Sequence, residues 1–69
     1  MDKQVLKIKL EKSIREEVPY IDIKPYSHNI IGMKLEQIGN EFGLEAVKEI
    51  IIKYHLDDKG WGYVLNLER

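Results

Sequence analysis

The strongest pattern in the sequence is a pair of apolar stripes at helical spacing that meet at Gly43. Apolar residues recur every three or four positions on both sides of this glycine, which is the spacing of one face of an α-helix. A glycine also suits the backbone conformation that commonly closes a helix. We therefore expect one helix that begins near residues 27–29 and ends near Phe42, and a second helix over residues 44–56. The stripe residues are Ile31, Leu35, Ile38, Phe42, Leu44, Val47, Ile50, Ile51 and Tyr54.

The N-terminal segment shows a shorter period. In residues 5–12, Leu6, Ile8 and Leu10 alternate with charged residues, which is typical of a half-buried β-strand. The Ser-x-x-Glu sequence at residues 13–16 has the form of a helix capping box. Because a proline soon follows, we expect only a single helical turn or a wide loop at that point.

Two further segments are expected to be strands. Residues 20–24 alternate isoleucines with charged side chains and end at a proline. Residues 61–67 place Trp61 and Tyr63 on one face together with two leucines. The sequence therefore predicts an α+β fold, in which a small, mostly antiparallel sheet packs on a helical hairpin in the order β-β-α-α-β.

The length of the chain limits how it can be stabilised. Its 69 residues fit a single compact domain, residues 1–69, and a domain of this size buries only about 60% of the surface that its unfolded chain exposes. There is no cysteine, which excludes a disulfide. Two histidines, His28 and His55, lack the spacing of metal ligands, so we expect no metal and no cofactor. Good packing or self-association must then supply the stability.

Several apolar residues lie off the main stripes. Ile30 and Met33 fall opposite the stripe of the first expected helix, and Ile52 falls on the charged side of the second. Apolar groups on a second face of so small a domain indicate another buried surface. Either the predicted sheet covers Ile30 and Met33, or these residues contact another protein. We expect a homo-oligomer or partner interface made by Ile30, Met33, Ile52, Trp61 and Tyr63.

The sequence offers little for catalysis. It has no Cys and no Thr to act as a nucleophile. Ser27 and His28 are neighbours, whose side chains point in different directions at a helix start. There is no glycine-rich phosphate loop and no metal-ligand motif. We therefore expect a protein that is not an enzyme.

Nucleic-acid binding is a further alternative. Residues 35–53 resemble a DNA-binding helix-turn-helix, with Gly39 where the helices would cross and Gly43 at the turn. The match fails at Glu49, where a buried branched residue is expected, and the second helix offers no Arg, Asn or Gln to read base edges. The chain has 11 basic and 12 acidic residues, so it lacks the basic excess that drives phosphate binding. Specific binding to duplex DNA is not expected.

The start of the first helix is a candidate site for a small anionic ligand. Backbone N–H groups at a helix N-terminus attract phosphate, and Ser27, His28 and Asn29 could add side-chain donors there. Lys24 could supply a positive charge, and Tyr26 could stack on a base. A helix cap would explain Ser27 or Asn29 without any ligand, but it would not explain His28. Sequestration of a nucleotide-like ligand by these five residues is therefore the second expected function.

No feature of the sequence indicates a membrane protein. The longest apolar run is Ile50–Ile52, far shorter than a membrane span. The N-terminal residues lack the apolar core and cleavage site of a signal peptide. We expect a cytoplasmic location without membrane contact.

Residues 25–61 resemble proteins encoded by phages. The sequences P-Y-S-H-N-I-I-G, L-E-Q-I-G-N-E-F-G and K-G-W look like those of small uncharacterised accessory proteins of tailed phages and prophages. The resemblance implies a non-enzymatic inhibitor that blocks a host protein, such as a host-defence antagonist in the host cytoplasm. The leading expectation is therefore a self-associating binding protein that occludes a host partner through an apolar patch rimmed by charged residues.

Overall fold

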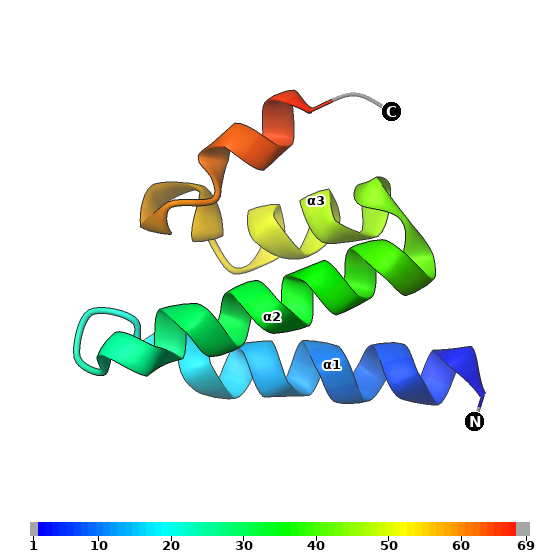
Figure 1. Cartoon of the computed structure of the whole chain (residues 1–69), viewed down its shortest axis with the longest axis horizontal. Coiled ribbons are helices and arrows are strands. Elements are labelled where there is room, and N and C mark those ends of the chain that lie inside the picture. The colour runs from blue at the N-terminus through cyan, green and yellow to red at the C-terminus, as the bar shows by residue number, and fades with distance from the viewer. Residues whose placement is uncertain (1, 68–69) are drawn as a thin grey trace.

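The chain forms three α-helices and three short 3₁₀ segments over residues 2–67, the part that this computed structural model describes. Helix α1 spans Lys3–Glu17, α2 spans Pro25–Phe42 and α3 spans Leu44–Lys53. The 3₁₀ segments are η1 (Val18–Tyr20), η2 (Leu56–Lys59) and η3 (Gly62–Asn66) (Figure 1). No β-strand occurs within residues 2–67, so the predicted α+β class and its order β-β-α-α-β are wrong, and the fold is all-α.

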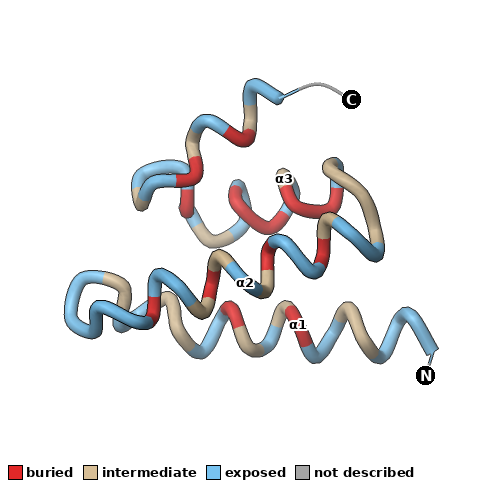
Figure 2. Tube along the Cα trace, viewed as in Figure 1, coloured by how far each residue is buried: buried red, intermediate tan, exposed pale blue. Residues whose placement is uncertain are grey.

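The helices lie in successive layers around one core. Helix α2 lies between α1 on one side and α3 with the C-terminal segment on the other, and successive helices run in opposite directions (Figure 1). The buried positions of each helix face its neighbours (Figure 2). The buried apolar side chains are Leu10, Ile14, Ile31, Leu35, Ile38, Ala46, Val47, Ile50, Ile51, Leu56, Trp61 and Val64.

Helix α1 replaces the first predicted strand. Leu6, Leu10 and Ile14 are four residues apart and so share one face of a helix, which packs against the core. Asp2 caps the helix, because its side chain accepts a hydrogen bond from the backbone N–H of Gln4. Ile8, which the strand would have buried, is 65% exposed. The expected capping box at residues 13–16 lies inside this helix rather than at a helix start.

The segment between α1 and α2 is a 3₁₀ segment followed by a hydrogen-bonded turn over residues 21–23, not the second predicted strand. Pro19 lies in the first turn of η1, where its fixed φ and missing N–H are tolerated. Ile21 packs against the core, while Ile23 is exposed. The alternation of the two isoleucines therefore does not reflect a shared buried face.

The C-terminal segment is also 3₁₀ rather than extended. Trp61 and Val64 are buried and three residues apart, which is one turn of a 3₁₀-helix. Gly60 precedes them with a φ of 114°, a conformation that glycine adopts without strain. Tyr63, expected to share a face with Trp61, is exposed instead.

The helical pair around Gly43 is confirmed. The predicted apolar stripes are buried or partly buried in the core, and Gly43 links the helices with a φ of 93°. Two boundaries differ from the prediction. Helix α2 begins at Pro25, with Lys24 rather than Ser27 or Asn29 as its N-cap, and α3 ends at Lys53.

No helix within residues 2–67 combines the length and the apolar character that crossing a membrane requires.

Candidate functional site

A hollow on the surface lies between α2, α3 and the C-terminal segment. It has a volume of about 380 Å³ and is open to solvent. Gly32 and Gly39 are seven residues apart, so they lie two turns apart on one side of α2, and their missing side chains leave the space. We call this hollow the α2 groove. Its lining consists of Gly32, Leu35, Glu36, Gly39, Val47, Trp61, Tyr63 and Val64.

The two glycines set the shape of the α2 groove. A Cβ atom added at Gly39 would lie 3.4 Å from Cγ2 of Val47, which is a close contact with α3. A Cβ atom added at Gly32 would lie 4.0 Å from Cζ2 of Trp61, which is an ordinary van der Waals distance. Gly39 therefore permits the close approach of α3, whereas Gly32 has room for a side chain that would enter the groove.

His28 packs against Trp61, one of the residues that line the groove. Its ring stacks on that of Trp61, with 4.2 Å between the ring centroids and 15° between the planes. Nε2 of His28 lies 3.1 Å from the backbone carbonyl oxygen of Lys59. Because a carbonyl oxygen can only accept a hydrogen bond, Nε2 must be the N–H donor in this contact. The two contacts tie α2 to the chain on both sides of Gly60.

Two polar side chains reach into the otherwise apolar lining. Glu36 is exposed and forms no ion pair with any residue between 2 and 67. Tyr63 is 64% exposed and presents both an aromatic ring and a hydroxyl. An unpaired carboxylate beside apolar walls can bind an apolar group that is accompanied by a positive charge.

The five residues of the predicted anion site have different surroundings, and none of them lines the α2 groove. Ser27 is fully buried, and its Oγ donates a hydrogen bond to Oε1 of Glu17 at 2.8 Å. The Lys24 ammonium lies 4.4 Å from the ring centroid of Tyr20. The remaining three members, Tyr26, His28 and Asn29, are exposed. The Glu17 carboxylate beside the first turn of α2 also supplies the negative charge that a helix N-terminus attracts.

The five residues of the predicted interface have different surroundings. Met33 and Ile52 are exposed, and Ile30 is half-buried. No sheet covers Met33 within residues 2–67, and 67% of its surface is open. Of the five, only Trp61 and Tyr63 line the α2 groove.

Sequence reasoning missed most of the groove lining. The seven-residue spacing of Gly32 and Gly39 inside an apolar helical pattern was the available signal. Such a spacing places two gaps above one another on one helix face. Val64 could not be found in this way, because its position depends on the 3₁₀ conformation of η3.

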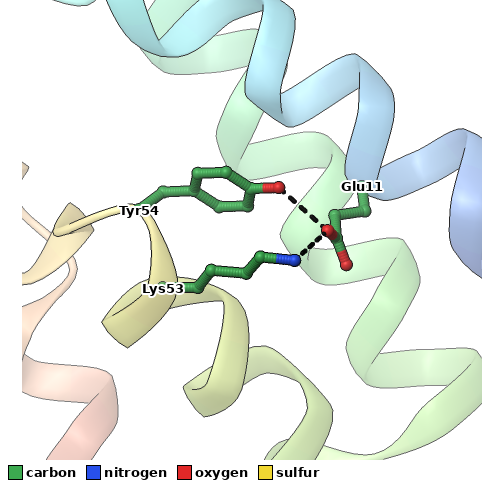
Figure 3. Close-up of polar contacts among 3 residues, drawn as sticks. All are labelled: Glu11, Lys53 and Tyr54. Atoms are coloured by element: carbon green, nitrogen blue, oxygen red, sulfur yellow. Dashed lines mark hydrogen bonds and ion pairs between the residues drawn. The ribbon is translucent and has the colours of Figure 1, made fainter.

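A second polar cluster joins α1 to the end of α3. Oε2 of Glu11 accepts hydrogen bonds from Nζ of Lys53 at 2.7 Å and from the hydroxyl of Tyr54 at 2.8 Å (Figure 3). The Lys53 hydrogen bond lowers the pKa of Glu11 below its ordinary 4.5, against the opposing effect of burial. Burial and the hydrogen bond to Glu11 raise the pKa of Tyr54 above 10.0. All three side chains of the cluster are joined through Oε2 of Glu11, which is the arrangement of a structural link.

The link between α2 and α3 differs from that of a helix-turn-helix. Only Gly43 separates the two helices, whereas the DNA-binding motif uses a turn of three or four residues. The exposed side of α3 carries Glu45, Glu49, Ile52 and Lys53, a mixed set without a basic excess. The geometry therefore gives the nucleic-acid alternative no support.

Within residues 2–67 no group of three or more His, Cys, Asp or Glu side chains could hold a metal ion. Comparison of the chain with protein-family models, with curated proteins and with solved structures gave no match.

Proposed function

We propose that the chain is a small non-catalytic protein-binding module, which acts by covering a surface of the protein that it binds. The observation that carries this proposal is the α2 groove, an open hollow whose described lining is largely apolar and includes the Glu36 carboxylate and the Tyr63 hydroxyl. Apolar clefts of this size bind ligands through their walls, and a few polar groups fix the orientation.

The chemistry of the lining favours a protein over a small polar ligand. A nucleotide requires several converging donors or positive charges, and among residues 2–67 no positively charged side chain lines the groove. Tyrosine, tryptophan and methionine are enriched at protein interfaces. Tyr63 and Trp61 line the groove, and the exposed Met33 follows Gly32 directly in α2.

The groove suits an amphipathic helix or a short segment with one large apolar side chain. In helix-in-groove recognition, apolar anchors at helical spacing enter a hydrophobic groove. The absence of a side chain at Gly32, where an added Cβ would come no closer than 4.0 Å to Trp61, lets a partner approach α2 closely. A basic residue beside the anchor would pair with the exposed Glu36.

The resemblance to phage accessory proteins makes a host protein in the host cytoplasm the expected target. Occlusion of such a target requires no chemistry from the chain, only a stable complex. The alternative of a nucleotide-like ligand near Ser27 has less support, because the Ser27 hydroxyl is already bonded to Glu17.

The experiment is a selection of displayed helical peptides against the purified chain, followed by binding measurements on variants. Gly32→Leu fills the groove with a side chain, and Gln37→Leu adds the same side chain on α2 at an exposed position that does not line the groove. Gly32→Leu should fold well, since leucine is a better helix former than glycine by about 0.5–1 kcal/mol.

Selected peptides should bind the wild type and Gln37→Leu alike and should lose at least about tenfold in affinity for Gly32→Leu, a change of about 1.4 kcal/mol. Their sequences should combine an aliphatic or aromatic residue with Lys or Arg. Peptides that bind Gly32→Leu as tightly as the wild type would show that the groove is not the binding surface.

A further inference from the structure

The outward face of α1 carries an apolar group that the fold leaves without a partner. Leu6, Leu10 and Ile14 turn toward the core, and Ile8 lies about 200° around the helix from Leu10. Ile8 is therefore on the opposite side, and its 65% exposure agrees with this placement. Val5, one turn earlier, is also exposed. The fold gives no reason for aliphatic residues at these positions.

Two positive charges follow these residues on the same face. Lys12 and Arg15 lie one and two turns beyond Ile8, and both are exposed. Neither forms an ion pair with any residue between 2 and 67. A shallow hollow of about 290 Å³ also runs along this face, lined by Lys7, Ile8, Glu11, Lys12 and Arg15. The outward face of α1 is thus an aliphatic stripe that continues into a basic end.

This face is complementary to the α2 groove. The groove has apolar walls and one carboxylate, that of Glu36. The same complementarity holds for the whole chain, because α1 carries five basic and three acidic residues while the remaining sequence carries six basic and nine acidic residues. Such a distribution favours contact between α1 of one molecule and the rest of another.

We infer that the α2 groove binds the outward face of α1 from a second copy of the chain. Ile8 of one copy enters the space beside Gly32 and Gly39, while Lys12 and Arg15 pair with Glu36. This inference rests on the proposed role of the groove as a protein-binding surface and names its occupant. The two contacting surfaces differ, so a single repeated contact forms head-to-tail rings or chains, and a reciprocal pair of contacts forms a two-fold dimer.

The test is a charge-exchange experiment followed by analytical ultracentrifugation at concentrations up to about 1 mM. One variant carries Glu36→Lys, and the other carries Lys12→Glu together with Arg15→Glu. All three positions are exposed, and circular dichroism establishes that both variants fold. Each variant alone places like charges across the interface, whereas a mixture restores opposite charges at every contact.

The wild type should associate as its concentration rises, and added salt should weaken the association. Each variant alone should sediment as the 8.1 kDa monomer, and the equimolar mixture should associate again. A monomeric wild type, or a mixture that stays monomeric, overturns the inference.

The outcome separates this inference from the proposed function. If the wild type is monomeric but still binds selected peptides in the groove, the inference about a second copy is wrong and the proposed binding function is supported. A monomeric wild type that also binds no peptide in the groove overturns both.

Discussion

The stack of His28 on Trp61 gives the sharpest single prediction about how the α2 groove is maintained. His28→Ala removes both the ring contact at 4.2 Å and the hydrogen bond to the carbonyl of Lys59. These contacts join α2 to the C-terminal segment, which from residue 56 to residue 67 contains 3₁₀ turns and no α-helix. Their loss should loosen that segment and destabilise the fold.

The size of the effect follows from the separate contributions. A stacked aromatic pair typically adds about 0.5–1.5 kcal/mol to the free energy of unfolding. A neutral hydrogen bond typically adds a net of about 0.5–1.5 kcal/mol. His28 is exposed, so the lower half of each range applies. Alanine recovers about 0.5 kcal/mol as the better helix former. The free energy of unfolding should therefore fall by about 1 kcal/mol, which lowers the Tm by about 4–8 °C in a domain of this size.

Urea and thermal unfolding followed by circular dichroism measure this loss. His28→Phe is the matched control, because it keeps an aromatic ring over Trp61 and lacks only the hydrogen-bond donor, so its stability should lie between those of the wild type and His28→Ala. Trp61 is the only tryptophan, and its fluorescence emission should change in His28→Ala. The reasoning is refuted if His28→Ala unfolds at the wild-type Tm with unchanged tryptophan emission.

The remaining predictions concern the contacts that hold α1 in place. The hydrogen bond from Lys53 lowers the pKa of Glu11 below 4.5. The ionised carboxylate therefore contributes its whole stabilising effect above pH 4.5, and this effect is lost as the pH falls through the lowered pKa. The Tm difference between the wild type and Glu11→Gln should therefore shrink on acidification, and a constant difference from pH 7 to 3 would contradict it. Ser27→Ala removes the buried donor to Glu17 and should cost about 1–2 kcal/mol in urea unfolding. An equal midpoint for Ser27→Ala and the wild type would show that this contact adds nothing.

The helical pair was predictable because its pattern is long. Ile31, Leu35 and Ile38 repeat over several turns, and Gly43 marks the boundary between the two helices. A repeat of this length fits the helical period and conflicts with the two-residue period of a strand. The start of α2 was misplaced by a few residues, because Ser27 is a good capping residue that is instead used in a buried hydrogen bond to Glu17.

The first strand was predicted wrongly because two periods coexist in the same residues. Leu6, Ile8 and Leu10 alternate as in a strand, while Leu6, Leu10 and Ile14 repeat as in a helix. The longer repeat determines the structure, since it places three side chains against one core, with Leu10 and Ile14 buried and Leu6 partly buried. Ile8 then lies on the outside, where it is 65% exposed.

The short C-terminal segment could not be assigned from its own residues. A 3₁₀ turn buries positions three apart, as with Trp61 and Val64, and a strand buries positions two apart, as with Trp61 and Tyr63. Over seven residues neither pattern is long enough to exclude the other. Packing against α2, including the stack with His28, decides between them.

The groove was only partly visible in the sequence. Gly39 was predicted to allow a close approach of two helices, and its short distance from Val47 agrees with this. The contact between His28 and Trp61 joins residues 33 positions apart, and no local pattern indicates it. The role of His28 therefore emerges only from the tertiary structure.

The most direct test of the central claim is an NMR titration of the ¹⁵N-labelled chain with a selected peptide. The account predicts that the amide signals of Gly32 and Gly39 and the indole signal of Trp61 shift on binding, that Gln37→Leu responds in the same way, and that Gly32→Leu does not respond. Shifts confined to residues outside the groove, or an unchanged response in Gly32→Leu, would contradict the claim that the α2 groove binds protein.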